Sequence, residues 1–332
     1  MTSILYNNAT MWSIDDPVYI FKNNNPSIIR LGLCCINNTL RNQGKKSEIF
    51  CSRSLTAKSY TRDKAHDLAL RNLQDLKTLL AWNHDHDIHH FRVTSDLFPR
   101  ITDSVIPRDQ RLRVVDYSHI LADIGQYARS IGQRLTMHPG QYNQIGAQDR
   151  GVFDRTVDDL TVHADILDYM GMDDNAILTI HGGGVYGHKE ATIKRWIQQF
   201  SLLPANVQRR IAIENCERQY NVGDCLRIAA ACRIPVIFDS HHFDCYNSIN
   251  GTSFQARDYI GHVLASWGER RAVMHISEQR PDARVGTHSD FIEVIPEYML
   301  SIPDEYDVGV DIEVEAKAKE AAIFKLRDKY HI

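Results

Sequence analysis

The sequence predicts an α/β fold, a single (β/α)₈ barrel of the TIM type, and three observations lead to this prediction. Short apolar runs alternate with stretches of helical periodicity along nearly the whole chain. Eight such runs can be distinguished, which is the number of strands that closes a parallel barrel. The length of 332 residues suits one such barrel. A doubly wound open sheet is the alternative, but the first run lacks the glycine-rich G-x-G-x-x-G turn that usually follows the first strand of such a sheet.

The elements follow one another in a regular order. The expected strands lie at 28–34, 89–94, 134–138, 176–181, 210–214, 235–239, 272–277 and 307–315. Helical periodicity is clearest between them, at 62–82, 113–131, 152–171 and 188–201. Residues 1–27 contain asparagine clusters and no clear period. We therefore interpret 1–27 as an N-terminal extension and 28–332 as the barrel domain.

The composition excludes several classes of protein. Hydrophobic residues make up 43% of the chain, yet no apolar run approaches the roughly 20 residues that span a bilayer. The N-terminus has no basic region followed by an apolar segment, so we expect neither a membrane partner nor secretion. The seven cysteines include no C-x-x-C pair, which indicates reduced thiols. The expected location is the cytoplasm and nucleoid of a bacterium, or the nucleus of a eukaryote.

Potential metal ligands close six consecutive expected strands. In such barrels the chemistry lies at the carboxyl ends of the strands. The residues that fall there are His138, His181, Glu214, Asp239 with His242, His275 with His288 in the following loop, and the pair Glu313 and Glu315. One histidine at a strand end is usually structural, and one acidic residue there often caps the next helix. Six successive strands that end in this way predict a metal site at the C-terminal mouth of the barrel.

The number and type of these residues predict more than one metal ion. Carboxylates and imidazoles gathered without cations would be costly to bury. Mixed histidine and carboxylate ligation suits Zn²⁺, Mn²⁺ or Fe²⁺ better than Ca²⁺. Eight ligands are too many for one ion, so we expect two or three divalent metal ions.

Two further motifs attract attention but fit other roles. The segment 84–90 (HDHDIHH) is rich in histidine, but it precedes the second strand and so belongs to the opposite mouth of the barrel. The H-G-G-G sequence at 181–184 resembles an esterase oxyanion hole, yet no G-x-S-x-G nucleophile motif accompanies it. Glycines that allow a close backbone approach explain it better.

At these positions the sequence resembles the UV-damage endonuclease family, whose barrel is related to that of endonuclease IV. The motifs occur in the family's order and cover nearly the whole chain from about residue 28. They are R-L-G at 30–32, S-D-L-F-P at 95–99, M-H-P-G-Q-Y at 137–142, H-G-G-G at 181–184, I-E-N at 213–215, F-D-x-H-H at 238–242, H-I-S at 275–277, H-S-D at 288–290 and E-A-K-A-K-E at 315–320.

The resemblance implies a role for individual residues. The implied metal ligands are His138, His181, Glu214, Asp239, His242, His275, His288 and Glu315, of which Glu214, His275 and Glu315 are the expected catalytic residues. Glu315 is preferred to Glu313 because it belongs to the E-A-K motif, although both would lie on one face of the strand. Gln141 and Tyr142 correspond to the family's damage-probing pair, and Asn37 to an asparagine near the lesion. Mn²⁺ is the preferred metal, with Zn²⁺ and Mg²⁺ as alternatives.

Two positions depart from the family pattern. Leu33 replaces a tyrosine that some members have in the first strand, which changes how the damaged bases are held. Val273 replaces a lysine that some members associate with the metal site, so the occupancy of a third metal position stays open.

The implied activity is a metal-dependent cut of damaged double-stranded DNA immediately 5′ to the lesion. Cleavage leaves a 3′-hydroxyl and a 5′-phosphate, and the implied lesions are cyclobutane pyrimidine dimers and 6-4 photoproducts, with abasic sites as a further class. Because the net charge is −4, phosphate binding must come from local basic loops. The basic candidates include Arg41, Lys45, Lys46 and Arg100, together with Arg280 and Arg284, and Lys317 and Lys319, which are expected to begin the last helix. No protein partner is predicted, and we take the chain to be a monomer.

Two other functions compete with this one. A metal-dependent sugar isomerase or epimerase on a related barrel would need one or two ions, an enclosed pocket and a proton-transfer base. A damage-binding protein without catalysis would keep the DNA contacts, and Val273 favours it slightly. The Gln141–Tyr142 pair beside a metal ligand favours the endonuclease over both.

Overall fold

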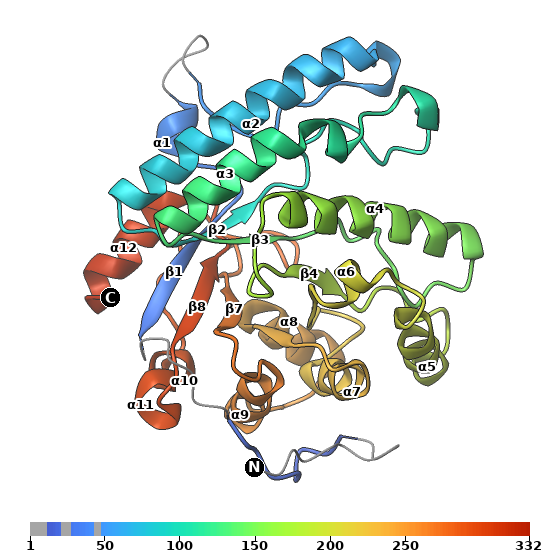
Figure 1. Cartoon of the computed structure of the whole chain (residues 1–332). Helices are drawn as coiled ribbons and strands as arrows, with labels where there is room; N and C mark the ends of the chain where they lie inside the picture. The colour runs from blue at the N-terminus through green and yellow to red at the C-terminus, as the bar shows by residue number, and fades with distance from the viewer. Residues whose placement is uncertain (1–11, 21–27, 43–47) are drawn as a thin grey trace.

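Eight parallel strands form a closed barrel in sequence order, as the sequence predicts (Figure 1). The computed structural model describes residues 12–20, 28–42 and 48–332, so the predicted DNA contacts Lys45 and Lys46 lie outside the described residues. The strands are β1 (Ile29–Cys34), β2 (His90–Val93), β3 (Arg134–Met137), β4 (Leu178–His181), β5 (Ile211–Glu214), β6 (Val236–Asp239), β7 (Ala272–Ile276) and β8 (Val310–Val314). Each lies inside its expected range, and β8 pairs with both β7 and β1 to close the ring.

Helices follow the strands and cover the outside of the barrel (Figure 1). The long ones are α2 (Arg62–Asp85), α3 (Ser118–Ser130), α4 (Arg150–Tyr169), α5 (Lys189–Phe200), α7 (Val222–Cys232), α8 (Ser240–Asn250), α9 (Arg257–Ser266) and α12 (Glu320–Tyr330). The short ones are α1 (Asn38–Arg41), α6 (Ala205–Gln208), α10 (Glu297–Leu300) and α11 (Ile302–Tyr306), with 3₁₀ turns at Ala57–Ser59, Arg108–Gln110 and Val114–Tyr117. None of the helices among the described residues is long and apolar enough to cross a membrane.

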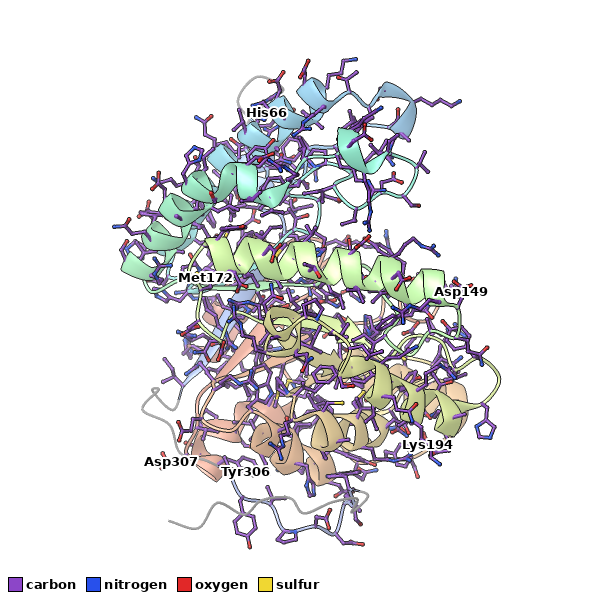
Figure 2. All side chains as sticks on the ribbon, turned by 45° about the vertical axis from the view of Figure 1, so that its right-hand side comes forward. His66, Asp149, Met172, Lys194, Tyr306 and Asp307 are labelled. Carbon is purple, nitrogen blue, oxygen red and sulfur yellow. The ribbon has the colours of Figure 1, made fainter. Side chains whose placement is uncertain are left out.

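Polar side chains fix where the helices begin. The Asp149 carboxylate accepts a hydrogen bond from the Val152 amide (2.8 Å) and so begins α4, which runs from there towards Met172 (Figure 2). The predicted start of the last helix at Lys317 is wrong by three residues. The Glu320 carboxylate accepts hydrogen bonds from the amides of Asn38 (2.8 Å) and Thr39 (2.7 Å) at the start of α1. This contact holds α12 to a start at Glu320.

The described part of the N-terminal extension lies against α9. The ring of Trp12 meets that of His262 edge-on at 5.3 Å, and the imidazole of His262 is 3.0 Å from the carbonyl oxygen of Ile14. Figure 1 shows this segment beside α9. The boundary between extension and barrel at residues 27 and 28 stays a prediction.

The interior of the barrel contains buried charges at the end opposite the predicted metal ligands. The fully buried Asp311 of β8 accepts hydrogen bonds from Arg30 (2.7 Å), Arg134 (2.8 Å) and Arg271 (2.6 Å). Burial alone would raise the pKa of Asp311, but its hydrogen bonds to His90 and Arg30 and the charge of Arg134 hold that pKa well below the usual range. One carboxylate of β8 therefore joins an arginine of β1, an arginine of β3 and the arginine that precedes β7. Most barrels of this type pack branched apolar side chains here.

A second polar layer lies above this one. The His90 imidazole is 3.2 Å from Asp311 and 2.8 Å from Glu313, so it bridges the two carboxylates of β8. Thr136 of β3 donates a hydrogen bond to Glu313 (2.6 Å). A β-carbon at Gly32 would lie 2.5 Å from the His90 ring, so glycine is needed there to let the imidazole cross the barrel. A continuous polar chain thus leads up the barrel axis towards the predicted metal site.

We predict that Asp311→Asn destabilises the protein by about 3–5 kcal/mol, because it leaves buried arginines without a counter-charge. Asp116→Asn is the matched control, since Asp116 pairs with Arg113 at the surface, where solvent screens the ion pair and its loss should hardly change stability. Urea unfolding followed by circular dichroism measures both. An Asp311→Asn midpoint equal to that of the control would contradict the structural role given to this carboxylate.

Candidate metal centre

Glu214, the last residue of β5, lies at the centre of the predicted ligands. Its carboxylate is buried, and one of its oxygens (Oε2) faces His138 at 3.0 Å and His181 at 3.5 Å. The other oxygen (Oε1) faces His275 at 2.9 Å and His242 at 3.5 Å. Four imidazoles, which lie in or just after four different strands, therefore converge on one carboxylate.

Asp239 completes the inner part of this cluster. It ends β6, and its carboxylate oxygen Oδ2 lies 3.8 Å from His242 and 4.0 Å from His275. Its other oxygen accepts a hydrogen bond from the His242 amide (2.6 Å), which begins α8. The Asn215 side chain binds the backbone of Asp239 in both directions at 2.9 Å. The start of α8 is thereby fixed, and with it the position of His242.

Glu315 and Glu313 lie on the same side of β8, but only Glu315 borders the outer part of the site. Glu315 is 3.5 Å from His275 and 3.6 Å from His288. Glu313 is fully buried, 3.0 Å from the far nitrogen of His275, and its other oxygen is held by Thr136 and His90. Glu313 thus lies beneath His275, and the preference for Glu315 as ligand stays a prediction.

The guanidinium of Arg92 lies between these two glutamates. One of its nitrogens contacts Glu315 and lies 3.1 Å from Glu313. Burial alone would raise the pKa of Glu315, but the charges of Arg92 and His275 outweigh burial and hold that pKa well below the usual range. Arg92 thus keeps the outer carboxylate ionised and balances part of its charge.

Burial and mutual contact set the protonation of the histidines. Burial lowers the pKa of His181 to about 4, so this imidazole is neutral at pH 7 and able to bind a metal. Burial would also lower the pKa of His275, but the charges of Glu214 and Glu313 raise it well above the usual value. The pKa of His242 is raised in the same way by Asp239 and Glu214. A cation bound here would replace the protons that these two histidines carry in its absence.

The donor groups fit divalent metal ions. Three sets of ligand atoms lie within 4.8 Å of one another: His138, His181 and Glu214; Glu214, Asp239 and His275; and Cys34, Glu313 and Glu315. The first two share Glu214, which suits neighbouring ions. The Oδ2 atom of Asp239 is buried without a hydrogen-bond partner, which is costly unless a cation binds there. The guanidinium of Arg92 contacts both glutamates of the third set, so the negative charge of this set is partly balanced within the protein.

The two other motifs take the structural roles expected of them. His86, at the end of α2, stacks on Trp82 at 3.7 Å, and the 84–90 segment lies at the opposite mouth of the barrel from Glu214. His90 alone of its histidines enters the barrel interior described above. In the H-G-G-G motif, a β-carbon at Gly182 would lie 2.5 Å from the Tyr220 ring, and Gly183 has a positive φ of 86°. Packing and backbone conformation require these glycines.

Of the two departures from the family pattern, one faces the outside of the barrel and the other faces its interior. Leu33 is fully buried, on the face of β1 opposite Gly32, so it faces the surrounding helices. This orientation does not fit the expectation that Leu33 changes how the damaged bases are held. Val273 is also fully buried, two residues before His275 and therefore on the inward face of β7. It supplies no ligand atom at that position.

Gln141 and Tyr142 lie in the loop after β3, directly beside the cluster. The amide nitrogen of Gln141 is 3.5 Å from the ring nitrogen Nε2 of His181. Tyr142 is 64% exposed, yet its hydroxyl donates a hydrogen bond to Asp159 (3.2 Å) on α4. Asp159 is buried and also accepts from Thr102 (2.6 Å) and from Asn143 (2.7 Å). An exposed aromatic ring is thus anchored at its far end.

The predicted DNA-binding residues differ in their surroundings. Asn37 is fully buried, and its side chain caps α1 by accepting from the Leu40 amide (2.9 Å). Arg41 is exposed, 5.0 Å above the Phe50 ring. Arg100 binds the carbonyl of Leu55 and the carboxylate of Asp103, so it is already engaged within the protein. Lys317 is exposed beside Glu315.

Several residues that shape the site were not predicted from the sequence. His90 and Arg92 alternate with the apolar Phe91 and Val93 in β2, and this period of two could have placed both inside the barrel. Asp159 sits in the middle of α4, where a carboxylate has no distinguishing sequence pattern. Its role becomes visible only when the loop after β3 folds over the helix.

Comparisons with known proteins agree on one family. A family model described as UV-endonuclease UvdE matches residues 29–331. A putative UV-damage endonuclease of Acanthamoeba polyphaga mimivirus is 35% identical over 314 residues, 92% of each chain. A UV-damage endonuclease of Schizosaccharomyces pombe is 32% identical over 91% of this chain, which spans about half (51%) of that longer relative.

Solved structures give the same result. The crystal structure of SacUVDE superposes with a TM-score of 0.79 at 30% identity, covering 91% of this chain and 99% of that one. Endonuclease IV from Thermus thermophilus shares the fold, with a TM-score of 0.53 at 14% identity over 90% of this chain and 97% of that one.

Proposed function

Because this chain belongs to the UV-damage endonuclease family, we propose that it cuts damaged double-stranded DNA immediately 5′ to a UV photoproduct. The proposed lesions are cyclobutane pyrimidine dimers and 6-4 photoproducts, with abasic sites as a further class. The proposed products are a 3′-hydroxyl and a 5′-phosphate. The observation that supports this most is the short distance of 3.5 Å between the Gln141 amide nitrogen and Nε2 of His181, which brings the loop proposed to probe damage close to a residue proposed to bind metal.

We propose two or three divalent ions, Mn²⁺ before Zn²⁺ or Mg²⁺. The residues that would hold them are His138, His181, Glu214, Asp239, His242, His275, His288 and Glu315. When bound, such ions lower the pKa of the attacking water and stabilise negative charge on the attacking and leaving oxygens. The chain's own part is to keep Glu214 and Glu315 ionised and to fix the imidazoles. Glu214, His275 and Glu315 are the residues proposed to act at the reacting phosphate.

Recognition of damage is assigned to Tyr142 and Gln141. Damaged bases stack poorly, so moving them out of the helix requires less energy than moving intact bases. The anchored ring of Tyr142 is suited to fill the space that they leave. Partial burial of its hydroxyl and the neighbouring Asp159 raise the pKa of Tyr142, so the hydroxyl stays protonated and keeps its hydrogen bond.

Contacts with the DNA backbone are proposed for Arg41, Lys45, Lys46, Arg100 and Lys317, with Asn37 near the lesion. Arg100 must exchange its present partners to take part. We propose that the chain acts as a monomer without a protein partner, in the cytoplasm and nucleoid of a bacterium or the nucleus of a eukaryote. Residues 1–27 are proposed to be an extension of the barrel domain 28–332, and the described part of this extension packs on α9.

We predict that the protein nicks a duplex carrying one cyclobutane dimer at the bond 5′ to the dimer when Mn²⁺ is present. Chelation should abolish the cut, and an undamaged duplex should stay intact. Glu214→Gln should lose nicking by at least about a thousandfold, because the central carboxylate of the cluster is neutralised. A denaturing gel with end-labelled strands measures the position and the rate.

The other outcomes of this assay point to other functions. Tight, damage-selective binding without a cut would indicate a damage-binding protein without catalysis. If the protein neither binds nor cuts the dimer duplex, this result would contradict a repair function. The search would then turn to sugar substrates, since related barrels carry out isomerisation.

We also predict that Tyr142→Ala lowers kcat/KM on the dimer duplex by about tenfold to a hundredfold, because stacking of a base on an aromatic ring contributes about 1–3 kcal/mol. Tyr142→Phe keeps the ring and loses only its anchor to Asp159, so its loss should be a few-fold. Tyr19→Ala is the control, since Tyr19 is similarly exposed (62%) in the segment that lies against α9. Equal rates for Tyr142→Ala and Tyr19→Ala would rule out the probing role.

A further inference from the structure

A hollow of about 370 Å³ opens beside the outer part of the metal centre. His288 and Glu315, both predicted ligands, form its inner end. Its other walls are Arg92, Gly286, Ala316, Lys317 and Lys319. At about 30 Å³ per water molecule, the hollow has room for roughly a dozen waters, enough for a phosphate and the sugar attached to it.

One wall of the hollow contains an unfavourable backbone conformation at Lys319. Its φ of 55° and ψ of −122° are those of the first central residue of a type II′ turn, a position dominated by glycine. The Ala321 amide donates to the Ala318 carbonyl (3.2 Å), which completes the turn. Among the described residues, the Lys319 ammonium has neither an ion-pair partner nor a hydrogen bond. No contact within the described protein therefore explains why a lysine occupies this position, and strain of this kind is concentrated at functional sites.

A second wall belongs to a hairpin over residues 278–289, which lines the hollow through Gly286 and His288 and carries two exposed arginines, Arg280 and Arg284, outside the lining. Gln279 and His288 form an antiparallel bridge at its base. The Gln279 side chain donates to the carbonyls of Arg280 (3.0 Å), Ala283 (3.3 Å) and Arg284 (3.1 Å), and it accepts from the Gly286 amide (2.8 Å). A single side-chain amide thus fixes the shape of an exposed loop. Neither Arg280 nor Arg284 has an acidic partner among the described residues.

The two walls are tied together, so the hollow has a fixed width at its base. The Lys317 amide donates to the Ser289 carbonyl (3.1 Å), and the Ala318 amide donates to that of Asp290 (2.9 Å). The charge inside is unbalanced. Arg92 is neutralised by Glu313 and Glu315, whereas the ammonium groups of Lys317 and Lys319 are not neutralised by any described residue.

We infer that this hollow is a subsite for a backbone phosphate of the DNA, next to the phosphate that is cut. Lys319 and Lys317 bind that phosphate on one wall, and Arg280 and Arg284 hold the strand on the other. Gln279 is a positioning residue that acts through the two arginines. This inference rests on the proposed function, because it takes the strand that enters the metal centre as its ligand.

Lys319→Gly separates a ligand-binding role from a structural one. Glycine adopts the turn conformation without strain, so the variant should unfold at the same temperature as the wild type or at a higher one. If Lys319 binds a phosphate, the same variant should bind DNA more weakly. If Lys319 has only a structural role, the variant should have an unfolding temperature and a DNA affinity equal to or higher than those of the wild type.

The experiment measures the dissociation constant for an undamaged duplex, which is not cut, at a series of salt concentrations with Mn²⁺ present. Each lost phosphate contact should lower the slope of log Kd against log salt by about 0.9. We expect this reduction for Lys319→Gly and for Lys317→Gln. In the double variant Arg280→Gln/Arg284→Gln the slope should fall by about twice as much. The slope of Gln279→Ala should be close to that of the double variant. Arg233→Gln, exposed before β6 at the opposite mouth, should keep the wild-type slope.

A wild-type slope in Lys319→Gly, or a weaker binding accompanied by a lower unfolding temperature, would overturn the subsite. Failure of the proposed function is distinguishable from this result. If the variants show the predicted changes of slope but the wild-type protein never nicks the dimer, the endonuclease function is contradicted and the phosphate subsite is not. A wild-type protein that nicks the dimer while all slopes are unchanged contradicts the subsite alone.

Discussion

The buried carboxylate of Glu214 imposes the main constraint on this structure. It is in contact with four imidazoles, and each comes from a different strand or the loop that follows it. Such a cluster forms only if strands β3 to β7 end at the same level around the barrel. The closed parallel topology meets that requirement, because it places all carboxyl ends of the strands at one mouth. The cluster also brings carboxylate oxygens and imidazole nitrogens close together, an arrangement that a divalent cation stabilises better than water or protons do.

The charges beneath the cluster show how the barrel supports it. Arg92 balances Glu315 and Glu313, His90 joins Glu313 to Asp311, and three arginines surround Asp311 at the far end. Carboxylates alternate along this path with arginines and the His90 imidazole, so no carboxylate on it is left without a partner. An apolar interior would pack as well, but it would offer no group to orient His275 or to keep Glu315 ionised. The barrel interior therefore serves as the foundation of the site as well as the core of the fold.

Much of this could be predicted from the sequence, for physical reasons. Strands buried on both sides read as short apolar runs, and a polar residue that closes each run must lie at the barrel mouth. The predicted ligands do converge, although their roles stay predictions. Contacts between distant segments could not be read in this way. The start of α12 was misplaced because E-A-K-A-K-E has helical composition, while the capture of Glu320 by α1 and the turn at Lys319 depend on the tertiary fold. The burial of Asn37 and the anchoring of Tyr142 by Asp159 are of the same kind.

Anomalous diffraction from crystals grown with Mn²⁺ is the direct test of the proposed binding of divalent metal ions at Glu214. We expect at least two anomalous peaks at the C-terminal mouth, with one or more within about 2.5 Å of a Glu214 carboxylate oxygen. Crystals of Glu214→Gln, grown in the same way, should lose at least one of them. A map without peaks at Glu214, or with peaks only at the histidines of the 84–90 segment, would contradict metal binding at Glu214.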